Sequence, residues 1–487
     1  MKLSASLALP LFALPTLGKK CFSPNKIERD ITTSALKKTL TDLNGIANRN
    51  GGNRAFGLPG FKASVDYILE QVQDNLGDQF DTWVQPFNHT FEQTRKISVT
   101  GPDGKDVFAI TLLYNPPTPK EGFTAALVDT PVNDENGSGC TEADWEGIDA
   151  TGKIALIKRG VCTLAEKLIL ARAHGAVAAI LYNQDPGTNY SSATLQAENR
   201  DKVIPTAVIP LEVGTDWKTR LAAGEELTVT LLVDSIFEDR ETWNVIAETK
   251  EGDADNVIFL GAHLDSVQAG PGINDDGSGT AGILEIARSF AKQKGIKNKV
   301  RFGWWGAEES GLVGSLYYTS QLTAEEADKI RYYFNYDMIG SPNPAYIVYE
   351  GEEIGSKKLF DYLEKAGKPA AYGAFGSSSD YVGFLQLGIP SSGLFTGAGD
   401  PEDPCYHQAC DDIGNIHWDA ITLNTKAAGR IAAEFALSLE GIPQRNTSTT
   451  PAKNRRGEIS LLNWETALAQ VQPVLPCSHE HDHDNLF

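Results

Sequence analysis

The sequence predicts an α/β protein whose mostly parallel central sheet carries helices on both faces, together with a separate unit ahead of that sheet. Strand, loop and helix patterns alternate from Thr242 onward, as in open α/β sheets. Residues 256–260 form a continuous apolar run, which is typical of a buried parallel strand. A proline-rich stretch at 115–120 leads into the separate unit, which covers about 122–233.

Before and within that unit, the apolar spacing predicts individual elements. A helix is expected around Leu36, Leu40 and Leu43. A second, amphipathic helix is expected over residues 61–76, where apolar residues recur every three or four positions. Inside the separate unit we expect a strand at 153–157, a helix at 164–174 and a strand at 176–182.

After the apolar run at 256–260, the pattern predicts a helix through Ile283 and Phe290 and then a strand at 300–305. Another strand, 332–336, ends directly before Asp337. Further helices are predicted by two sets of spaced apolar residues, Leu359 with Leu363 and Ile431 with Phe435 and Leu439.

The composition excludes two classes of protein. The 487 residues are 41% hydrophobic and 22% charged, which is ordinary for a globular chain and excludes wholesale disorder. There are 43 basic and 64 acidic residues, a formal net charge of −21. Such an excess of acidic residues argues against a protein that binds nucleic acids or anionic membrane surfaces, because both of these ligands are negatively charged and bind to basic patches.

The first 18 residues have the pattern of a secretory signal peptide. A lysine precedes a short apolar run, and small residues stand before the expected cleavage point. No later segment is long and apolar enough to predict a membrane span. We therefore expect secretion to the outside of the cell, with the lumen of a vacuole as the alternative.

Cysteines and glycosylation motifs agree with that route. Proximity favours a disulfide between Cys405 and Cys410, although six cysteines allow fifteen pairings. The acceptor pattern Asn-x-Ser/Thr predicts glycosylation at four positions: Asn88, Asn136, Asn189 and Asn446.

Residues that can bind metals follow successive predicted strands. One strand ends in Gly261-Ala-His-Leu-Asp265, and the next loop, 272–279, contains Asp275 and Asp276. Further strands lead into Gly306-Ala-Glu-Glu-Ser-Gly311 and Asp337, and a later loop holds His407. Each feature alone is ordinary for a structural histidine, a helix start or a turn. Their joint placement where parallel strands end predicts a site that binds cations through mixed oxygen and nitrogen ligands.

These motifs also carry a family resemblance. Residues from about 242 to 440 resemble the di-zinc aminopeptidase family, which includes secreted fungal leucine aminopeptidases and vacuolar aminopeptidase Y. The resemblance lies in seven motifs in order: GAHLDS (261–266), AGPGINDDGSG (269–279), WWGAEESGLVGS (304–315), NYDMIGSPN (335–343), SSDY (378–381), GLFTGA (393–398) and CYHQACD (405–411). The fold it implies is that of the zinc exopeptidases.

The separate unit resembles an α+β protease-associated domain inserted into the peptidase. Its pattern is carried by GCTEADW (139–145) and GKIALIKRGVCTLAEK (152–167), and the cysteines of such domains often pair, which implies a Cys140–Cys162 disulfide. The chain is accordingly divided into five parts: a signal peptide (1–18), a first part of the peptidase domain (19–120), the protease-associated domain (121–234), the di-zinc domain (235–445) and a polar tail (446–487).

Carried over position by position, the resemblance implies a centre of two Zn²⁺ ions. His263 and Asp337 are implied to bind one ion, and Glu309 and His407 the other. Asp275 is implied to bridge both ions.

The resemblance assigns other roles around this centre. Glu308 is implied to be the general base, and Tyr406 to hydrogen-bond the tetrahedral oxyanion. Asp265 is implied to orient the nearby imidazole, and the peptide bond between Asp275 and Asp276 to be cis.

One position departs from the family. Related enzymes often have Gly-Arg-Ser-Asp-Tyr/His where this chain reads Gly376-Ser-Ser-Ser-Asp-Tyr381, so Ser378 stands in place of an arginine at the substrate. The departure bears on residue preference and rate, and it leaves the metal ligands intact.

The expected function is that of a secreted aminopeptidase, which releases large apolar residues from peptides and proteins with free amino termini. Alternatives are a glutaminyl cyclase or carboxypeptidase on the same fold, and a non-catalytic binding or receptor-like protein. Cyclases drop part of the ligand set, carboxypeptidases need a basic cluster, and receptor-like relatives lose ligands and carry a membrane span. The sequence shows none of these features.

Overall fold

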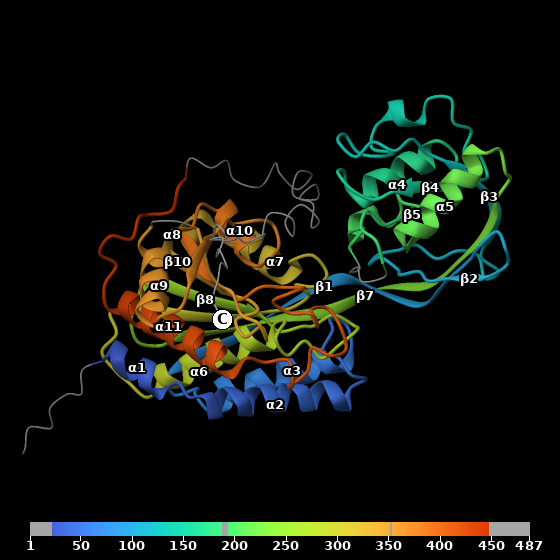
Figure 1. The fold of residues 1–487 in the computed structure, drawn as a ribbon. Coiled ribbons are helices and arrows are strands. Elements are labelled where there is room, and N and C mark those ends of the chain that lie inside the picture. Colours follow the sequence, from blue (N-terminus) through green and yellow to red (C-terminus); the bar gives the residue numbers. More distant parts are fainter. Residues whose placement is uncertain (1–21, 188–192, 351–352, 448–487) are drawn as a thin grey trace, which may run out of the picture.

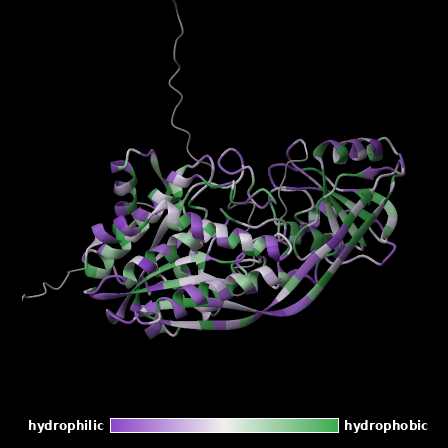
Figure 2. Cartoon of the chain, turned by 90° about the horizontal axis from the view of Figure 1, so that it is seen from below, coloured by the Kyte–Doolittle hydropathy of each residue, from purple (hydrophilic) through white to green (hydrophobic). Residues whose placement is uncertain are grey.

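The computed structural model describes residues 22–187, 193–350 and 353–447, which form two bodies joined by a long ribbon (Figure 1). The ribbon consists of β1 (Phe80–Thr100) and β7 (Thr228–Thr249), which pair antiparallel along nearly their whole length. Figure 2 shows hydrophilic residues along its middle. The sequence pattern did not predict these strands, because their polar middle lacks the apolar alternation of a half-buried strand.

The larger body contains the predicted mostly parallel sheet. β8 (Asp253–His263) lies at its centre and pairs in parallel with both β9 (Asn298–Trp305) and β10 (Ile330–Tyr336). β10 also pairs in parallel with β13 (Ser391–Phe395). At the edge, β11 (Tyr346–Tyr349) runs antiparallel to β13 and parallel to β12, and β12 spans Ala370–Gly373.

Helices cover both faces of this sheet, as predicted, because alternate residues of its strands are buried on opposite sides. Ile258 and Leu260 of β8 belong to one core, whereas Phe259 belongs to the other. The helices whose residues join the first core are α1 (Pro24–Asp30), α2 (Thr33–Arg49), α3 (Pro59–Leu69), α6 (Gly277–Ala291), α9 (Ile354–Lys365) and α11 (Trp418–Leu437). On the other face lie α7 (Val313–Gln321), α8 (Ala324–Lys329) and α10 (Tyr381–Gln386) (Figure 1).

Two predicted helices near the start of the chain form with small differences. α2 buries Leu36, Leu40 and Leu43, and the Thr32 side chain caps its first turn. The second helix ends earlier than its apolar spacing predicts, since α3 gives way at Leu69 to a π-helical turn over Glu70–Asp74. That turn shifts the register of the buried face near the end of the pattern.

The smaller body is built on a second parallel sheet. β4 (Ile154–Lys158) pairs with β5 (Ala178–Tyr182), which pairs with β6 (Thr206–Ile209). β3 (Phe123–Asp129) lies between β4 and the ribbon strand β7, and β2 (Asp106–Val107) pairs with β1. The remaining elements are α4 (Leu164–Ala173), α5 (Leu211–Ala222) and short 3₁₀ turns at Glu142–Trp145 and Ala197–Asn199.

The chain crosses between the two bodies inside a regular strand and not in an irregular linker. β7 runs without interruption through residues 234 and 235, so the chain passes from one body to the other inside a strand. Val99, Leu112 and Tyr114, which precede the proline-rich stretch, are buried in the cores of the smaller body.

Candidate metal and catalytic site

The predicted ligands meet at one edge of the larger sheet because its central strands are parallel. β8 ends at His263, β9 leads into Glu308 and Glu309, and β10 leads into Asp337. Asp275 lies in the loop before α6, on the same edge. The carboxyl ends of neighbouring parallel strands lie together, so residues far apart in sequence become neighbours.

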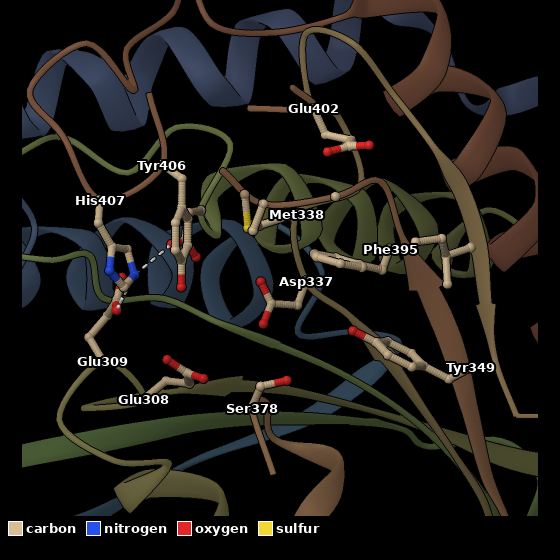
Figure 3. A pocket seen from close by; sticks show the side chains of 14 residues that line it. Glu308, Glu309, Asp337, Met338, Tyr349, Ser378, Phe395, Glu402, Tyr406 and His407 are labelled. Carbon is tan, nitrogen blue, oxygen red and sulfur yellow. Dashed lines mark ion pairs between the residues drawn. The ribbon is translucent and has the colours of Figure 1, made fainter. Parts of the chain in front are cut away.

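Two imidazoles flank a shared carboxylate at this edge. His263 Nε2 lies 3.2 Å from Asp275 Oδ1 and 3.7 Å from Asp337 Oδ1. His407 Nε2 lies 3.1 Å from Asp275 Oδ2 and 3.0 Å from Glu309 Oε2 (Figure 3). The geometry therefore divides into two half-sites, each with one histidine and one carboxylate of its own, and Asp275 belongs to both.

The donor atoms of these half-sites suit cations. Asp275 Oδ2, Glu309 Oε1 and Asp337 Oδ1 are buried oxygens that accept no hydrogen bond among the described residues. Leaving a buried carboxylate oxygen unsatisfied is costly unless a cation or another donor binds there. Two histidines and three carboxylates are also the ligand types that divalent zinc accepts.

Glu308 differs from its neighbour Glu309 in its surroundings. Its Oε2 lies 3.9 Å from His263 Nε2, and its side chain is buried and lines the pocket. Glu309, in contrast, contacts His407 directly. Adjacent carboxylates thus point to different parts of the centre (Figure 3).

Asp276 is a scaffold residue, although it is close enough to His263 to be grouped with it as a possible ligand. Its Oδ1 accepts hydrogen bonds from the main-chain N–H groups of Gly279 (2.8 Å) and Met338 (3.2 Å), and its Oδ2 from that of His263 (3.2 Å). Both oxygens therefore accept hydrogen bonds, whereas Asp275 Oδ2 accepts none among the described residues and lies 3.1 Å from His407 Nε2. The peptide bond between Asp275 and Asp276 is cis.

Asp265 holds the glutamate pair through the main chain. Its carboxylate oxygens accept hydrogen bonds from the N–H groups of Glu308 (3.0 Å) and Glu309 (3.3 Å). His263 Nδ1 lies 3.2 Å from the main-chain oxygen of Asp265 and 3.8 Å from its Oδ1. Asp265 thus contacts both sides of the centre.

A chain of hydrogen bonds that sequence reasoning missed orients Asp337. Ser379 Oγ donates to Asp337 Oδ2 (2.6 Å), and Asn335 Nδ2 donates to Ser379 Oγ (2.8 Å). Tyr333 donates to Asn335 Oδ1, and Trp305 Nε1 donates to the Tyr333 hydroxyl. The sequence signal for this chain was that Trp305, Asn335 and Ser379 belong to the motifs WWGAEESGLVGS, NYDMIGSPN and SSDY.

Arg54 is a second residue that sequence reasoning missed. It is fully buried behind the centre, and its guanidinium donates to the main-chain oxygens of Leu264, Pro271 (2.8 Å) and Gly272 (2.5 Å). These acceptors belong to the loop that connects His263 to Asp275. A buried guanidinium that donates hydrogen bonds to several carbonyl oxygens fixes the position of this loop. Its positive charge also offsets part of the negative charge of the carboxylates at the centre.

Strained backbone surrounds the predicted ligands. Ala307, which precedes Glu308, has φ 58°, Met338 has φ 51° and His407 has φ 58°. Non-glycine residues in this left-handed region cost about 1–3 kcal/mol each and persist where the surrounding structure enforces them, commonly at functional sites.

The titration of the centre reflects its crowded carboxylates. Burial raises the pKa of Glu308 well above its ordinary value and also raises the pKa of Glu309. Burial acts to lower the pKa of His407, but Glu309 and Asp275 together outweigh burial and raise that pKa to about 10. Against the effect of burial, the neighbouring imidazoles of His263 and His407 hold the pKa of Asp275 below its usual range. A centre with this excess of carboxylates favours bound cations.

A pocket opens from the centre, and its remaining wall is largely apolar. Tyr406 lines it and stacks on the His407 ring with a centroid distance of 3.8 Å. Ser378, at the position of the family arginine, also lines the pocket, and its Oγ lies 3.2 Å from the Tyr381 hydroxyl. The apolar wall consists of Met338, Ile347, Tyr349, Phe395 and Ala398. Figure 3 shows Met338, Tyr349 and Phe395 of this wall.

The disulfide predictions are confirmed. Cys405 and Cys410 pair, with Cα atoms 5.3 Å apart, in the loop that carries Tyr406 and His407. Cys140 and Cys162 pair in the smaller body, with Cα atoms 5.8 Å apart.

Other sequence-based predictions concern the surface and the chain ends. The predicted glycosylation sites Asn88, Asn136 and Asn446 are exposed, whereas Asn189 lies outside the described residues. The predicted signal peptide, 1–18, also lies outside them. Within the described part of the chain, no helix combines the length and apolar character needed to cross a membrane.

Comparison with known proteins agrees with this geometry. The model of peptidase family M28 matches residues 244–432, and the PA domain model matches residues 123–217. Aminopeptidase Y of Saccharomyces cerevisiae is 35% identical over 93% of this chain and 87% of its own length. Leucine aminopeptidase 2 of Arthroderma otae is 40% identical over 83% of this chain and 84% of its own.

Solved structures of two bacterial enzymes share the fold. An aminopeptidase from Aneurinibacillus sp. strain AM-1 has a TM-score of 0.72 at 28% identity, over 88% of this chain and 98% of its own. A zinc aminopeptidase from Bacillus subtilis has a TM-score of 0.67 at 27% identity, over 89% and 98%. The predicted fold class and the predicted enzyme family are thereby confirmed. This chain belongs to peptidase family M28, among the aminopeptidases, and carries a PA domain.

Proposed function

We propose that this protein is a di-zinc aminopeptidase that hydrolyses the first peptide bond of peptides and proteins with a free amino terminus. The observation that supports it most directly is the pair of histidine–carboxylate half-sites that share Asp275. The similarity to a zinc aminopeptidase of Bacillus subtilis supports zinc as the metal.

The residues that would hold the ions follow from the half-sites. His263 and Asp337 would bind one zinc ion, Glu309 and His407 the other, and Asp275 both. Bound zinc supplies a Lewis acid that polarises the scissile carbonyl and lowers the pKa of the attacking water.

Glu308 is the proposed general base. Its carboxylate lines the pocket without contacting His407, so it is available to accept the proton of the attacking water. The same carboxyl group then delivers this proton to the nitrogen of the leaving amine. The contact of Glu309 with His407 supports metal binding as its role, so the two adjacent carboxylates would have different roles.

Tyr406 and Asp337 complete the proposed machinery. The Tyr406 ring is held against His407, which leaves its hydroxyl to donate a hydrogen bond to the developing oxyanion. At the other half-site, Asp337 and Glu308 offer carboxylate oxygens to the α-ammonium group of the substrate. A free amino terminus is therefore part of what the site recognises.

The apolar wall of the pocket supports a preference for large apolar amino-terminal residues. Met338, Tyr349 and Phe395 remove the side chain of such a residue from water, which contributes about 1.5–3 kcal/mol for a leucine or phenylalanine.

We also propose that the protein is secreted, with the vacuole lumen as the alternative destination. Two disulfides support an oxidising compartment. The exposure of Asn88, Asn136 and Asn446 is compatible with glycosylation on that route.

The function is tested by measuring metal content together with the release of amino acids from a panel of aminoacyl anilides. We expect about two zinc ions per chain and rapid release of leucine and phenylalanine. His263→Ala should lose both zinc and activity, whereas His174→Ala, in the PA domain, is the matched control and should lose neither. One ion or none with activity retained would contradict the di-zinc centre.

A blocked substrate separates this function from its alternatives. Peptides with an acetylated amino terminus should resist hydrolysis, because they present no ammonium group to Asp337 and Glu308. Their rapid cleavage would instead indicate an endopeptidase or a carboxypeptidase.

A further inference from the structure

We propose that a second cavity, at the junction of the two bodies, binds the second residue of the substrate and favours an apolar side chain there. This inference rests on the proposed aminopeptidase function and extends the same site. The cavity, called the junction cleft below, lies between the loop after β8, strand β1 and residues Leu113 and Tyr114 of the smaller body. Glu309 lines both the junction cleft and the active-site pocket, so the two cavities meet at a proposed metal ligand.

The junction cleft and the apolar wall of the pocket lie on opposite sides of the centre. In the sheet, β10, β13 and β11 lie on one side of β8, whereas β9, β7 and β1 lie on the other. The first group supplies the apolar wall, through Met338, Ile347 and Phe395. The second group supplies the junction cleft, because β9 leads into Glu309 and β1 contains Phe91.

This arrangement sets the direction in which a bound peptide leaves the centre. Figure 3 shows Phe395 and Tyr349 on one side of Asp337, and Glu309 on the other. When the first side chain lies against Phe395 and the scissile carbonyl lies at the centre, the chain beyond the scissile bond continues past Glu309. The residue that follows the scissile bond then reaches the junction cleft.

The walls of the junction cleft are held in place by contacts between distant segments. The guanidinium carbon of Arg240 lies 3.7 Å from the centroid of the Phe91 ring, and the rings of Phe56 and Phe91 pack with centroids 6.1 Å apart. Gln268, in the loop after β8, donates its side-chain amide to the main-chain oxygen of Glu92 (2.6 Å). The cleft is therefore formed before a ligand enters, which lowers the cost of binding.

The polar side chains of the junction cleft are engaged with the protein itself. Glu92 Oε1 accepts a hydrogen bond from the Thr94 hydroxyl (2.7 Å), and Glu92 Oε2 accepts one from the main-chain N–H of Tyr114 (3.3 Å). The Tyr114 hydroxyl donates to the main-chain oxygen of Thr90 (3.2 Å). Both oxygens of Asp265 accept hydrogen bonds from main-chain N–H groups.

Apolar surface is what the junction cleft offers to a ligand. Phe56 and Phe91 are buried in its wall, and Leu113 and Val267 are half-buried at it. Its volume is about 50 Å³, against about 80 Å³ for the active-site pocket. A leucine or valine side chain would lose contact with water there, whereas a glycine at the same position gains nothing.

The test varies the second residue of the substrate. We would measure kcat/KM for the release of leucine from leucyl-leucinamide and leucyl-glycinamide, with leucinamide as the reference that lacks a second residue, using the zinc-loaded full chain. The variants Val267→Ala and Leu113→Ala shorten the wall of the cleft from the larger and the smaller body. Val84→Ala changes a half-buried valine of β1 that lines neither cavity, and it serves as the matched control.

We expect the wild-type protein to favour leucyl-leucinamide over leucyl-glycinamide about tenfold, because the leucine side chain is removed from water. Val267→Ala and Leu113→Ala should each lower this ratio about threefold, since each removes methyl groups that the leucine side chain contacts. Val84→Ala should keep the wild-type ratio. Both rates of a ratio come from the same protein sample, so a partly unfolded variant still gives a valid ratio.

The outcomes separate this inference from the proposed function. If the wild-type protein releases leucine from leucinamide but does not distinguish the two dipeptide amides, the junction cleft does not bind the second residue and the aminopeptidase stands. The same conclusion follows if neither Val267→Ala nor Leu113→Ala lowers the ratio. If the wild-type protein releases leucine from none of the three substrates, the aminopeptidase function itself is refuted.

Discussion

The PA domain and the peptidase domain each contain three neighbouring parallel strands whose carboxyl-terminal halves are almost wholly buried. Where two of the PA strands end, charged groups form ion pairs: Lys158 contacts Asp134 at 2.7 Å, and Asp129 contacts Lys218 at 2.6 Å. Where the peptidase strands end, Asp275, Glu309 and Asp337 keep buried oxygens without hydrogen bonds.

This difference shows that a parallel sheet supplies a place for chemistry but not the chemistry itself. Both sheets bring several strand ends together, yet of the two, within the described residues, the peptidase sheet is the one that gathers three carboxylates and two imidazoles there. Substitutions in the two domains should therefore affect turnover of a small substrate very differently.

The largest effect is expected for Glu308→Gln. Glutamine keeps the size of the side chain but cannot accept the proton, and loss of a general base costs about 10²–10⁴ in rate. Turnover of leucine anilide should collapse while zinc content and folding stay near wild type. Glu309→Gln is the matched variant and should weaken zinc binding, because an amide oxygen is a poorer ligand. The reverse pattern would exchange the two roles.

Tyr406→Phe should lower kcat by about 10², since an oxyanion donor typically contributes 10²–10³. Phenylalanine can keep the ring stacked on His407, so zinc content should not change. Tyr349→Phe removes a hydroxyl from another tyrosine of the same pocket and should leave kcat close to wild type. Equal losses in both variants would remove Tyr406 from the machinery.

Asp265→Asn should weaken zinc affinity about 10- to 100-fold, as for other residues that orient metal ligands. The new amide would place donor hydrogens against the N–H group of Glu308 or Glu309, which now donates to a carboxylate. Competition with a chelator measures the affinity. Unchanged affinity would mean that the loop keeps its position without Asp265.

The smallest effect on turnover is expected in the PA domain. Trp145 is buried there and stacks on His174, so Trp145→Ala should cost about 3–5 kcal/mol of stability in that domain. The rate with leucine anilide should stay near wild type at temperatures where the domain is folded. Trp304→Ala, the equivalent truncation beneath the metal site, should reduce both stability and rate. A loss of rate in Trp145→Ala would show that the PA domain supports the centre.

The sequence predicted some parts of the structure well and missed others. Strand and helix patterns in the two sheets were readable because each buried strand is a short apolar run and each helix repeats its apolar residues locally. The β1–β7 ribbon was missed because its polar middle is stabilised by pairing between segments about 150 residues apart. A local sequence pattern contains no information about a pairing strand at that distance along the chain.

For the site, the sequence by itself determined the chemical types: histidines, carboxylates and a tyrosine, placed after strands or in adjacent loops, in motifs that resemble one enzyme family. The resemblance implied how they divide between two ions, and the tertiary structure decided how these side chains lie relative to one another, since Asp275 and His407 meet through chain folding. It also decided the supports, because Arg54 reaches carbonyl groups more than 200 residues away. Ligand identity is a local property of the chain, whereas ligand geometry and the satisfaction of buried polar groups depend on long-range packing.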